Sequence, residues 1–329
     1  MLAWRGNVNA CQSNGNRRGL RWAAPVLLLL LAACAGTPQT DRLLDPATAP
    51  AGLPERVELS DVPFIPQEDL WCGPAAMAMV VTWSGLPVTQ EEMAAQVYTE
   101  GREGTLTSDM VSGARRNGRL AVPVETLEDL LAELAAGHPV IVFQNLALDF
   151  YPQWHYAVAY GYDLEAGTIL LHSGLEERHE TRLGTFEYTW RRADDWALLV
   201  LPPDMLPATS SAVDVAAAAA GIERAGLPVE AATAYRTLLS RWPDNGTAWL
   251  GLGNIAYGGG DLDGAIANYR KATQVDPAMG AAWNNLAVAL SDAGDQAAAR
   301  QAAETAIATD DGHEAAYRET LEEIAAAGG

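Results

Sequence analysis

The spacing of apolar residues changes along the chain and divides it into three parts. Residues 22–33 form an unbroken apolar run. Between about residues 58 and 203, short strand-like apolar runs such as 140–143 and 156–161 alternate with helix-like patterns. Beyond residue 213 the strand-like runs cease, and an Ala-rich helical pattern continues to the end of the chain. This order predicts an export segment, an α+β domain and an all-α region.

The first part has the organisation of a secretory signal, because Arg17, Arg18 and Arg21 precede an apolar run too short to span a bilayer. The run ends in Leu-Ala-Ala-Cys-Ala-Gly at 31–36, which resembles the lipobox of bacterial lipoproteins. The resemblance implies cleavage before Cys34 and acylation of Cys34, and several acyl chains give a stable membrane anchor. A plain signal peptide with an incidental cysteine is the alternative. Because Ala35 is not Asp, the resemblance implies the outer membrane of a bacterial cell envelope, with the protein facing the periplasm.

Composition sets the expected boundaries. We expect a signal peptide at residues 1–33 and a Pro-, Ala- and Thr-rich tether at 34–57, where no apolar period is present. The α+β domain follows at 58–203. A Pro- and Ser-rich linker occupies 204–212, and the helical region covers 213–329.

The helical region repeats with a period of 34 residues, as the pairs Trp249/Trp283 and Tyr235/Tyr269 show. This period, with its Trp, small-residue, aromatic and Pro positions, resembles the tetratricopeptide repeat (TPR). The resemblance implies three helical hairpins at about 213–243, 247–277 and 281–311, and a capping helix at 314–326. Two uses stay open: a scaffold without a ligand, or a groove for a peptide or a protein partner.

Charge and cysteine content narrow the chemistry. The formal net charge of −21 argues against a nucleic-acid partner, since no basic patch is available to neutralise phosphates. If Cys34 is acylated, Cys72 is the only unmodified thiol of the exported chain and has no disulfide partner. His172 and His179 lie near several glutamates, but their spacing fits no metal motif, and we predict neither a metal nor a cofactor.

Cys72 is the candidate nucleophile. It is followed by Gly73 and Pro74 and then by a helical apolar pattern, which predicts that the cysteine lies at a helix N-terminus. There the helix dipole is expected to favour the thiolate. Gln67, five residues upstream, can donate its side-chain amide to an oxyanion. The alternative is a buried, inert thiol.

His155 is the best candidate for the base among five histidines, because a loop enters a central strand at this position. Trp71 and Trp154, next to Cys72 and His155, are expected either to pack in the core or to form walls of a substrate cleft.

The order of Gln, Cys-Gly-Pro and His-Tyr-Ala-Val, followed by a Gly-Tyr-Asp turn, resembles the bacteriocin-processing peptidases, family 39 of the cysteine peptidases. The resemblance covers about residues 58–203. It implies a papain-like fold with Cys72 as nucleophile, His155 as base and Gln67 as oxyanion donor. In that family an Asp usually orients the histidine, whereas Ser173 stands at this place here. A serine can accept the imidazole N–H but cannot stabilise imidazolium as a carboxylate does.

Three interpretations of the Ser173 position follow: Ser173 orients the ring, an acid such as Asp163 takes over, or the enzyme is weakened.

The principal hypothesis for the whole chain is an envelope-anchored cysteine peptidase whose repeats recruit a substrate or a partner. The first alternative is a peptidase-like domain that binds peptides without turnover. The second is an assembly lipoprotein in which the repeats do the work.

Overall fold

The computed structural model describes residues 36–99, 101 and 104–327. The expected signal peptide and Cys34 lie outside these residues. Thr37–Gly329 cluster as one compact unit. Within the described part of the chain, no helix is both long and apolar enough to cross a bilayer.

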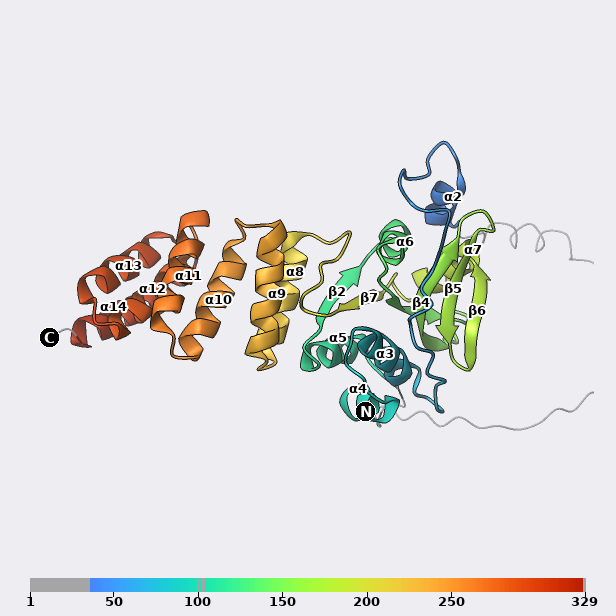
Figure 1. The fold of residues 1–329 in the computed structure, drawn as a ribbon, viewed down its shortest axis with the longest axis horizontal. Coiled ribbons are helices and arrows are strands. Elements are labelled where there is room, and N and C mark those ends of the chain that lie inside the picture. Colours follow the sequence, from blue (N-terminus) through green and yellow to red (C-terminus); the bar gives the residue numbers. More distant parts are fainter. Residues whose placement is uncertain (1–35, 100, 102–103, 328–329) are drawn as a thin grey trace, which may run out of the picture. The chain divides into compact units, whose positions relative to one another are not determined.

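An antiparallel sheet forms the centre of the first half of the chain (Figure 1). Its strands follow the order β2-β7-β3-β4-β5-β6, and β1 pairs with β4 beyond the bulge at Ala159/Gly161. The bounds are β1 Arg56–Glu58, β2 Leu120–Val124, β3 Val140–Asn145, β4 Trp154–Asp163, β5 Thr168–Ser173, β6 Glu176–Arg182 and β7 Ala197–Leu201.

Helices cover both faces of the sheet. One face packs on α3, α4 and α5, and the other on α6 and α7. The bounds are α3 Cys72–Trp83, α4 Gln90–Val97, α5 Thr107–Arg116, α6 Leu127–Ala135 and α7 Leu183–Arg191. Alternation along β4 separates the two cores, because Tyr156 and Val158 face α3 whereas Ala157 faces the other side.

Residues 38–44 differ from the expected tether, because they form a docked helix, α2 (Pro38–Leu44). Thr40 and Leu43 are buried. The carboxylate of Glu187 on α7 accepts hydrogen bonds from the backbone amides of Gln39 at 3.1 Å and Thr40 at 2.7 Å. These amides belong to the first turn of α2, whose N–H groups have no partner within the helix. A long-range contact therefore fixes a segment that has no apolar period of its own.

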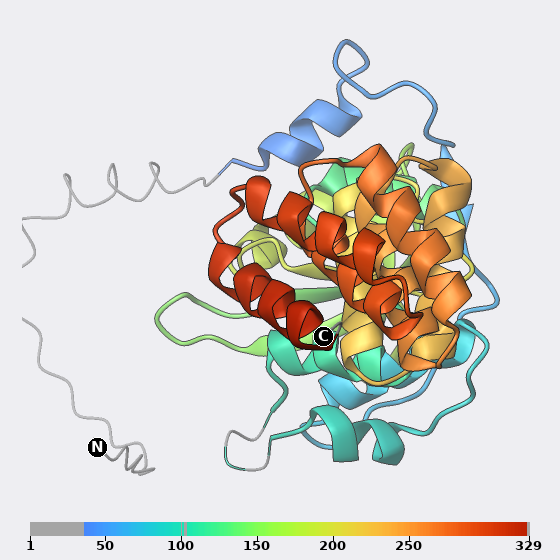
Figure 2. The same ribbon diagram turned by 90° about the vertical axis from the view of Figure 1, so that its left-hand side faces the viewer.

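Seven helices of the described chain follow the linker and form three hairpins and a final helix (Figures 1 and 2). The bounds are α8 Ala212–Arg224, α9 Pro228–Arg241, α10 Gly246–Gly258, α11 Leu262–Val275, α12 Gly280–Asp292, α13 Gln296–Ala308 and α14 Glu314–Ala327. The expected α+β domain and all-α repeat region are both confirmed.

The 34-residue period has a physical basis at several positions. Gly226, Gly260 and Gly294 have φ of 81°, 79° and 87° in the turn between the two helices of each hairpin, a conformation that glycine adopts without steric cost. Trp249 donates its indole N–H to the carbonyl of Pro243 at 2.9 Å, and the equivalent bond from Trp283 to Pro277 is 3.0 Å.

Gly253 should be intolerant of a side chain, because a Cβ there would lie 2.3 Å from the buried ring of Tyr269. We expect Gly253→Ala to lower the free energy of unfolding by about 1–3 kcal/mol. Gly258→Ala in the same helix is the matched control, since nothing lies within 4 Å of its Cβ position. It should be neutral or stabilising by up to about 1 kcal/mol. Urea unfolding of the full chain measures both, and equal effects would contradict this account of the packing.

Candidate active site

Cys72 is the first residue of α3, so its thiol lies at the N-terminus of a buried helix. Pro74 is the third residue of α3 and lies in the first turn, where the backbone N–H groups have no intrahelical partner and the missing N–H of proline costs nothing. Leu70, just before the helix, has φ of 66°, which is uncommon for a residue with a branched side chain. The chain thus enters the helix through an unfavourable conformation that the surrounding structure enforces.

The thiol of Cys72 is harder to ionise than its place at a helix N-terminus predicts. Burial raises the pKa of the thiol above its ordinary value, although hydrogen bonds from the backbone amides of Tyr156 and Gly73 act in the opposite direction. The position at the helix N-terminus therefore does not make Cys72 a stable thiolate, because desolvation of the charged form outweighs it.

Gly73 has a packing role beside the site. A Cβ at this position would lie 2.6 Å from the hydroxyl oxygen of Thr105. Thr105 lies on the loop before α5, and its carbonyl accepts a hydrogen bond from the Tyr156 hydroxyl at 3.3 Å. The absence of a side chain at Gly73 thus lets this loop approach Cys72.

His155 is the second residue of β4 and pairs across the sheet with Gln144 of β3. Its Nε2 lies 2.9 Å from the hydroxyl of Ser173, the last residue of β5. Burial lowers the pKa of His155 to about 4, and the nearby His179 adds to this effect. The imidazole is therefore neutral at pH 7, with Ser173 behind it.

Asp163 cannot replace the missing acid. It is the last residue of β4, whereas His155 is near the first. Eight residues of extended strand separate the two by about 26 Å. Asp163 instead accepts the backbone amide of Ala166 at 2.8 Å in the following turn.

Gln67 lies beside the end of β5, where its backbone amide donates to the carbonyl of Gly174 at 3.2 Å. Gln90 of α4 holds the same loop from the other side. Its side chain accepts from the backbone amide of Glu68 at 3.2 Å and donates to the carbonyl of Pro66 at 3.3 Å. The loop carrying Gln67 is therefore fixed next to Ser173.

Gln67, Cys72 and His155 line one cavity of about 770 Å³. Its walls also include Phe143, Trp154 and Tyr156 from β3 and β4, and residues 104–107. Trp71 lies outside this set and lines a neighbouring hollow with Glu68, Asp69 and Leu175, which shares Gln67 with the cavity. Of the two flanking tryptophans, only Trp154 contributes to the wall around the thiol and the imidazole.

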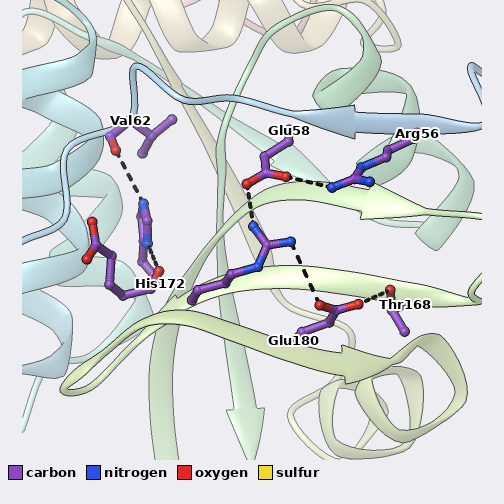
Figure 3. Close-up of polar contacts among 8 residues, drawn as sticks. Arg56, Glu58, Val62, Thr168, His172 and Glu180 are labelled. Atoms are coloured by element: carbon purple, nitrogen blue, oxygen red, sulfur yellow. Dashed lines mark hydrogen bonds and ion pairs between the residues drawn. The ribbon is translucent and has the colours of Figure 1, made fainter.

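The three remaining histidines of the α+β domain have structural contacts. His172 stacks on Tyr160, with ring centroids 4.1 Å apart, and its ring nitrogens contact the carbonyls of Glu177 and Val62 (Figure 3). His138 contacts the buried carboxylate of Glu133 at 2.7 Å. His179 pairs with Glu176 at 2.8 Å.

Beside His172, a polar network ties β1 to the β5–β6 hairpin (Figure 3). It consists of Arg56, Glu58, Arg178, Glu180 and Thr168.

Three residues of the site were not anticipated from the sequence. The backbone amide of Tyr156 lowers the pKa of the Cys72 thiol, Thr105 packs on Gly73, and Gln90 brackets the loop of Gln67. Tyr156 could have been inferred from its place beside His155. No local pattern marks Thr105 or Gln90, because their roles arise from long-range packing.

Comparison with known families identifies both parts of the chain. Residues 59–197 match the profile of the Peptidase_C39 like family, and residues 223–274 and 253–314 match that of the tetratricopeptide repeat. This protein carries a C39-like peptidase domain followed by TPRs. A C39-like peptidase domain implies a peptide substrate, and TPRs imply protein partners. No protein with a curated description matches the chain.

Several solved structures are similar to one part of the chain or the other. A C39-like peptidase from Bacillus anthracis is 21% identical, with a TM-score of 0.39, 45% of this chain covered and 98% of the other. The peptidase domain of Streptococcus ComA is 20% identical, with a TM-score of 0.36 and coverages of 43% and 98%. The Sgt2 TPR domain from Aspergillus fumigatus is 24% identical, with a TM-score of 0.34 and coverages of 36% and 79%.

The low pKa of His155 predicts a specific pH dependence of stability. Because its folded-state pKa of about 4 lies below the ordinary 6.5, the unfolded chain binds the proton more tightly between these values. Stability contributed by the neutral ring is therefore lost as the pH falls through this window, by at most about 3 kcal/mol. Urea unfolding should show this loss in the wild type and a correspondingly smaller loss in His155→Gln. Identical pH profiles of the two proteins would contradict the buried, neutral state.

Proposed function

We propose that the C39-like domain is a cysteine peptidase in which Cys72 attacks the peptide carbonyl and His155 transfers the proton. The observation that carries the proposal is the convergence of a helix-terminal thiol, an imidazole hydrogen-bonded to Ser173 and the Gln67 loop on one cavity. These residues also follow one another along the chain in the order that resembles the C39 peptidases.

The reaction begins from a neutral pair. His155 Nε2 is occupied by Ser173, so Nδ1 accepts the thiol proton as the Cys72 sulfur bonds to the carbonyl carbon. The developing oxyanion accepts hydrogen bonds from the Gln67 side-chain amide and from backbone N–H groups at the start of α3. The imidazolium then protonates the leaving amine. Water adds to the thioester, and cleavage of the C–S bond releases the carboxylic acid and restores the thiol and the neutral ring.

Ser173 limits this mechanism, because a hydroxyl orients the ring without stabilising the positive charge that develops on it. The raised pKa of Cys72 and the lowered pKa of His155 both disfavour the ion pair. These observations also favour a second candidate function, in which the domain binds a peptide without turnover.

Replacing Ser173 tests the mechanism. In Ser173→Asp, a carboxylate beside the imidazole should raise the pKa of His155 and stabilise the ion pair. We expect alkylation of Cys72 by iodoacetamide at pH 7 to become at least about tenfold faster, with a parallel gain in hydrolysis of a quenched-fluorescence peptide library. Ser173→Asn is the matched neutral control and should change the alkylation rate little. Peptide mapping by mass spectrometry assigns the label to Cys72.

Hydrolysis by the wild type decides between the two candidate functions, and Cys72→Ala tests the assigned nucleophile. Loss of all hydrolysis in this variant, together with activity in the wild type, supports the peptidase. Hydrolysis that survives Cys72→Ala would overturn the assigned nucleophile. If neither the wild type nor Ser173→Asp hydrolyses any peptide of the library, but the wild type binds library peptides in a direct binding assay, the result supports the peptide-binding module.

We further propose that Cys34 carries a lipid anchor that holds the protein at the bacterial envelope, facing the periplasm, while the repeats recruit a substrate or a protein partner. The lipobox-like segment at 31–36 supports the anchor.

Metabolic labelling tests the lipid anchor. Cells fed alkyne-tagged palmitate should label the wild-type protein and retain it in the membrane fraction. Cys34→Ala should abolish the label, because the proposal puts the acyl chains on the Cys34 sulfur and on the amino group that cleavage creates there. Cys11→Ala is the matched control and should be labelled like the wild type, since cleavage removes this cysteine. An exported but unlabelled wild-type protein would indicate a plain signal peptide.

A further inference from the structure

We propose that the loop between β3 and β4, together with the start of β4, forms a surface that contacts a lipid bilayer. We define this aromatic loop as residues 146–154. The inference rests on the lipid anchor proposed for Cys34 and is independent of whether the peptidase turns over.

The aromatic loop gathers large apolar side chains that are exposed. The exposed fraction is 84% for Phe150, 73% for Tyr151 and 54% for Leu148, and Trp154 and Leu146 follow at 51% and 44%. Single exposed apolar residues are ordinary on protein surfaces, but five of them within the nine residues of one loop are a candidate interaction site. Tyrosine and tryptophan in particular suit the boundary between headgroups and acyl chains, because each has an apolar ring and a polar tip.

A rigid base supports the aromatic loop. The buried side chain of Asn145 accepts hydrogen bonds from the backbone amides of Ala147 at 3.1 Å and Gln153 at 3.0 Å. Leu146 donates its amide to the carbonyl of Gln153 at 2.9 Å. Arg192, just after α7, donates to the carbonyl of Asn145 at 2.6 Å. The loop therefore presents its rings from a fixed frame, and binding costs little conformational entropy.

The anchor would hold the domain on a short connection. The docking of α2 through Glu187 fixes the chain from about Thr37 onward. Cys34 lies three residues before Thr37, so even an extended connection spans only about 10 Å. An acylated Cys34 would thus keep this part of the C39-like domain near the lipid headgroups, whereas the expected tether to residue 57 would have allowed far greater separation.

Helix α7 links the anchored end to the aromatic loop. The Thr37 side chain packs beside Gly184 near the start of α7, and Arg192 holds Asn145 directly after its end. Nine helical residues span about 14 Å. A domain attached at one end of α7 can therefore reach the bilayer with the loop at the other end. Because the chain has a net charge of −21, aromatic insertion rather than attraction to anionic lipid supplies the contact.

Contact of this loop with lipid would place the candidate active site at the membrane surface. Gln153 and Trp154 belong to the aromatic loop and also line the cavity that contains Cys72. Peptide segments close to the bilayer would then enter the cavity directly.

Lipid-dependent quenching tests the contact in the full, anchored chain. Phe150→Cys is labelled with a nitrobenzoxadiazole dye in a Cys72→Ala background and incorporated into phosphatidylethanolamine–phosphatidylglycerol vesicles. Lipids spin-labelled near the headgroup should quench this dye at least about twofold more than the same dye at Val213→Cys. Val213 is the matched control, because it is 74% exposed and lies on α8.

Each outcome bears on the inference. Equal quenching at the two positions, with the protein sedimenting with the vesicles, would overturn the loop contact and leave the anchor intact. Failure of the protein to sediment would overturn both the anchor and the contact. The dye at position 150 could instead respond to added peptides, by a change in its fluorescence, and not to spin-labelled lipids. That result would identify the loop as a wall of the substrate cavity and overturn the proposal.

Discussion

The alternation of side chains along β4 is the constraint on which the site depends. Because neighbouring residues of a strand point to opposite faces, β4 contributes to two cores at once. Tyr156 and Val158 pack towards α3, while Ala157 packs towards the helices of the other face. This arrangement fixes α3 on one face with its N-terminus at the first residues of β4. The sulfur of Cys72 then meets the backbone of Tyr156, next to His155. A shift of β4 by one residue would exchange the two faces and separate the pair.

The burial that assembles the site also opposes its ionisation. Cys72 and His155 are each removed from water, and desolvation raises the pKa of the thiol and lowers that of the imidazole to about 4. A helix N-terminus favours an anion by about 0.3–1 kcal/mol at an ordinary site, which is less than one pKa unit. A carboxylate behind the ring would supply a larger opposing effect, but Ser173 occupies that place. In the proposed mechanism, charge separation therefore forms together with the bound substrate, when the proposed oxyanion donors come into use.

Periodic features of the fold were predictable from the sequence, whereas long-range contacts were not. The 34-residue spacing of Trp249 and Trp283 indicated the hairpins, because each hairpin repeats the same local contacts. Family resemblance predicted roles for Cys72, His155 and Ser173, and these roles stay predictions, although the structure brings His155 and Ser173 into contact. The docking of α2 was missed, since it depends on Glu187, which lies almost 150 residues away. The pKa of Cys72 was missed because burial is a property of the packed domain and not of the helix start.

The linker between the two modules is also more ordered than its composition indicates. Glu133 of α6 is fully buried and accepts hydrogen bonds from the amides of Ala208 and Thr209 at 3.1 and 2.8 Å, besides its contact with His138. Burial alone would raise the pKa of Glu133, but the hydrogen bonds from His138 and Thr209 hold it below its ordinary value. Removing a hydrogen-bond partner of Glu133 should lower the free energy of unfolding, because it would leave the buried carboxylate without compensation for its charge.

The first repeat hairpin continues the core of the C39-like domain. The apolar cluster on the α6 side of the sheet extends through Ile222 of α8 and Tyr235 of α9 to Leu252 of α10. Gly221 of α8 also approaches Arg115 of α5 so closely that a Cβ would lie 2.4 Å from the guanidinium Nε. Removing everything from residue 213 onward would expose this core and confound any test of the repeats. Helix α10 contributes to this cluster and also packs, through Leu250 and Tyr257, on a separate apolar cluster that includes Tyr269 and Leu286. A truncation that keeps the core of the C39-like domain intact must therefore retain the first hairpin and α10.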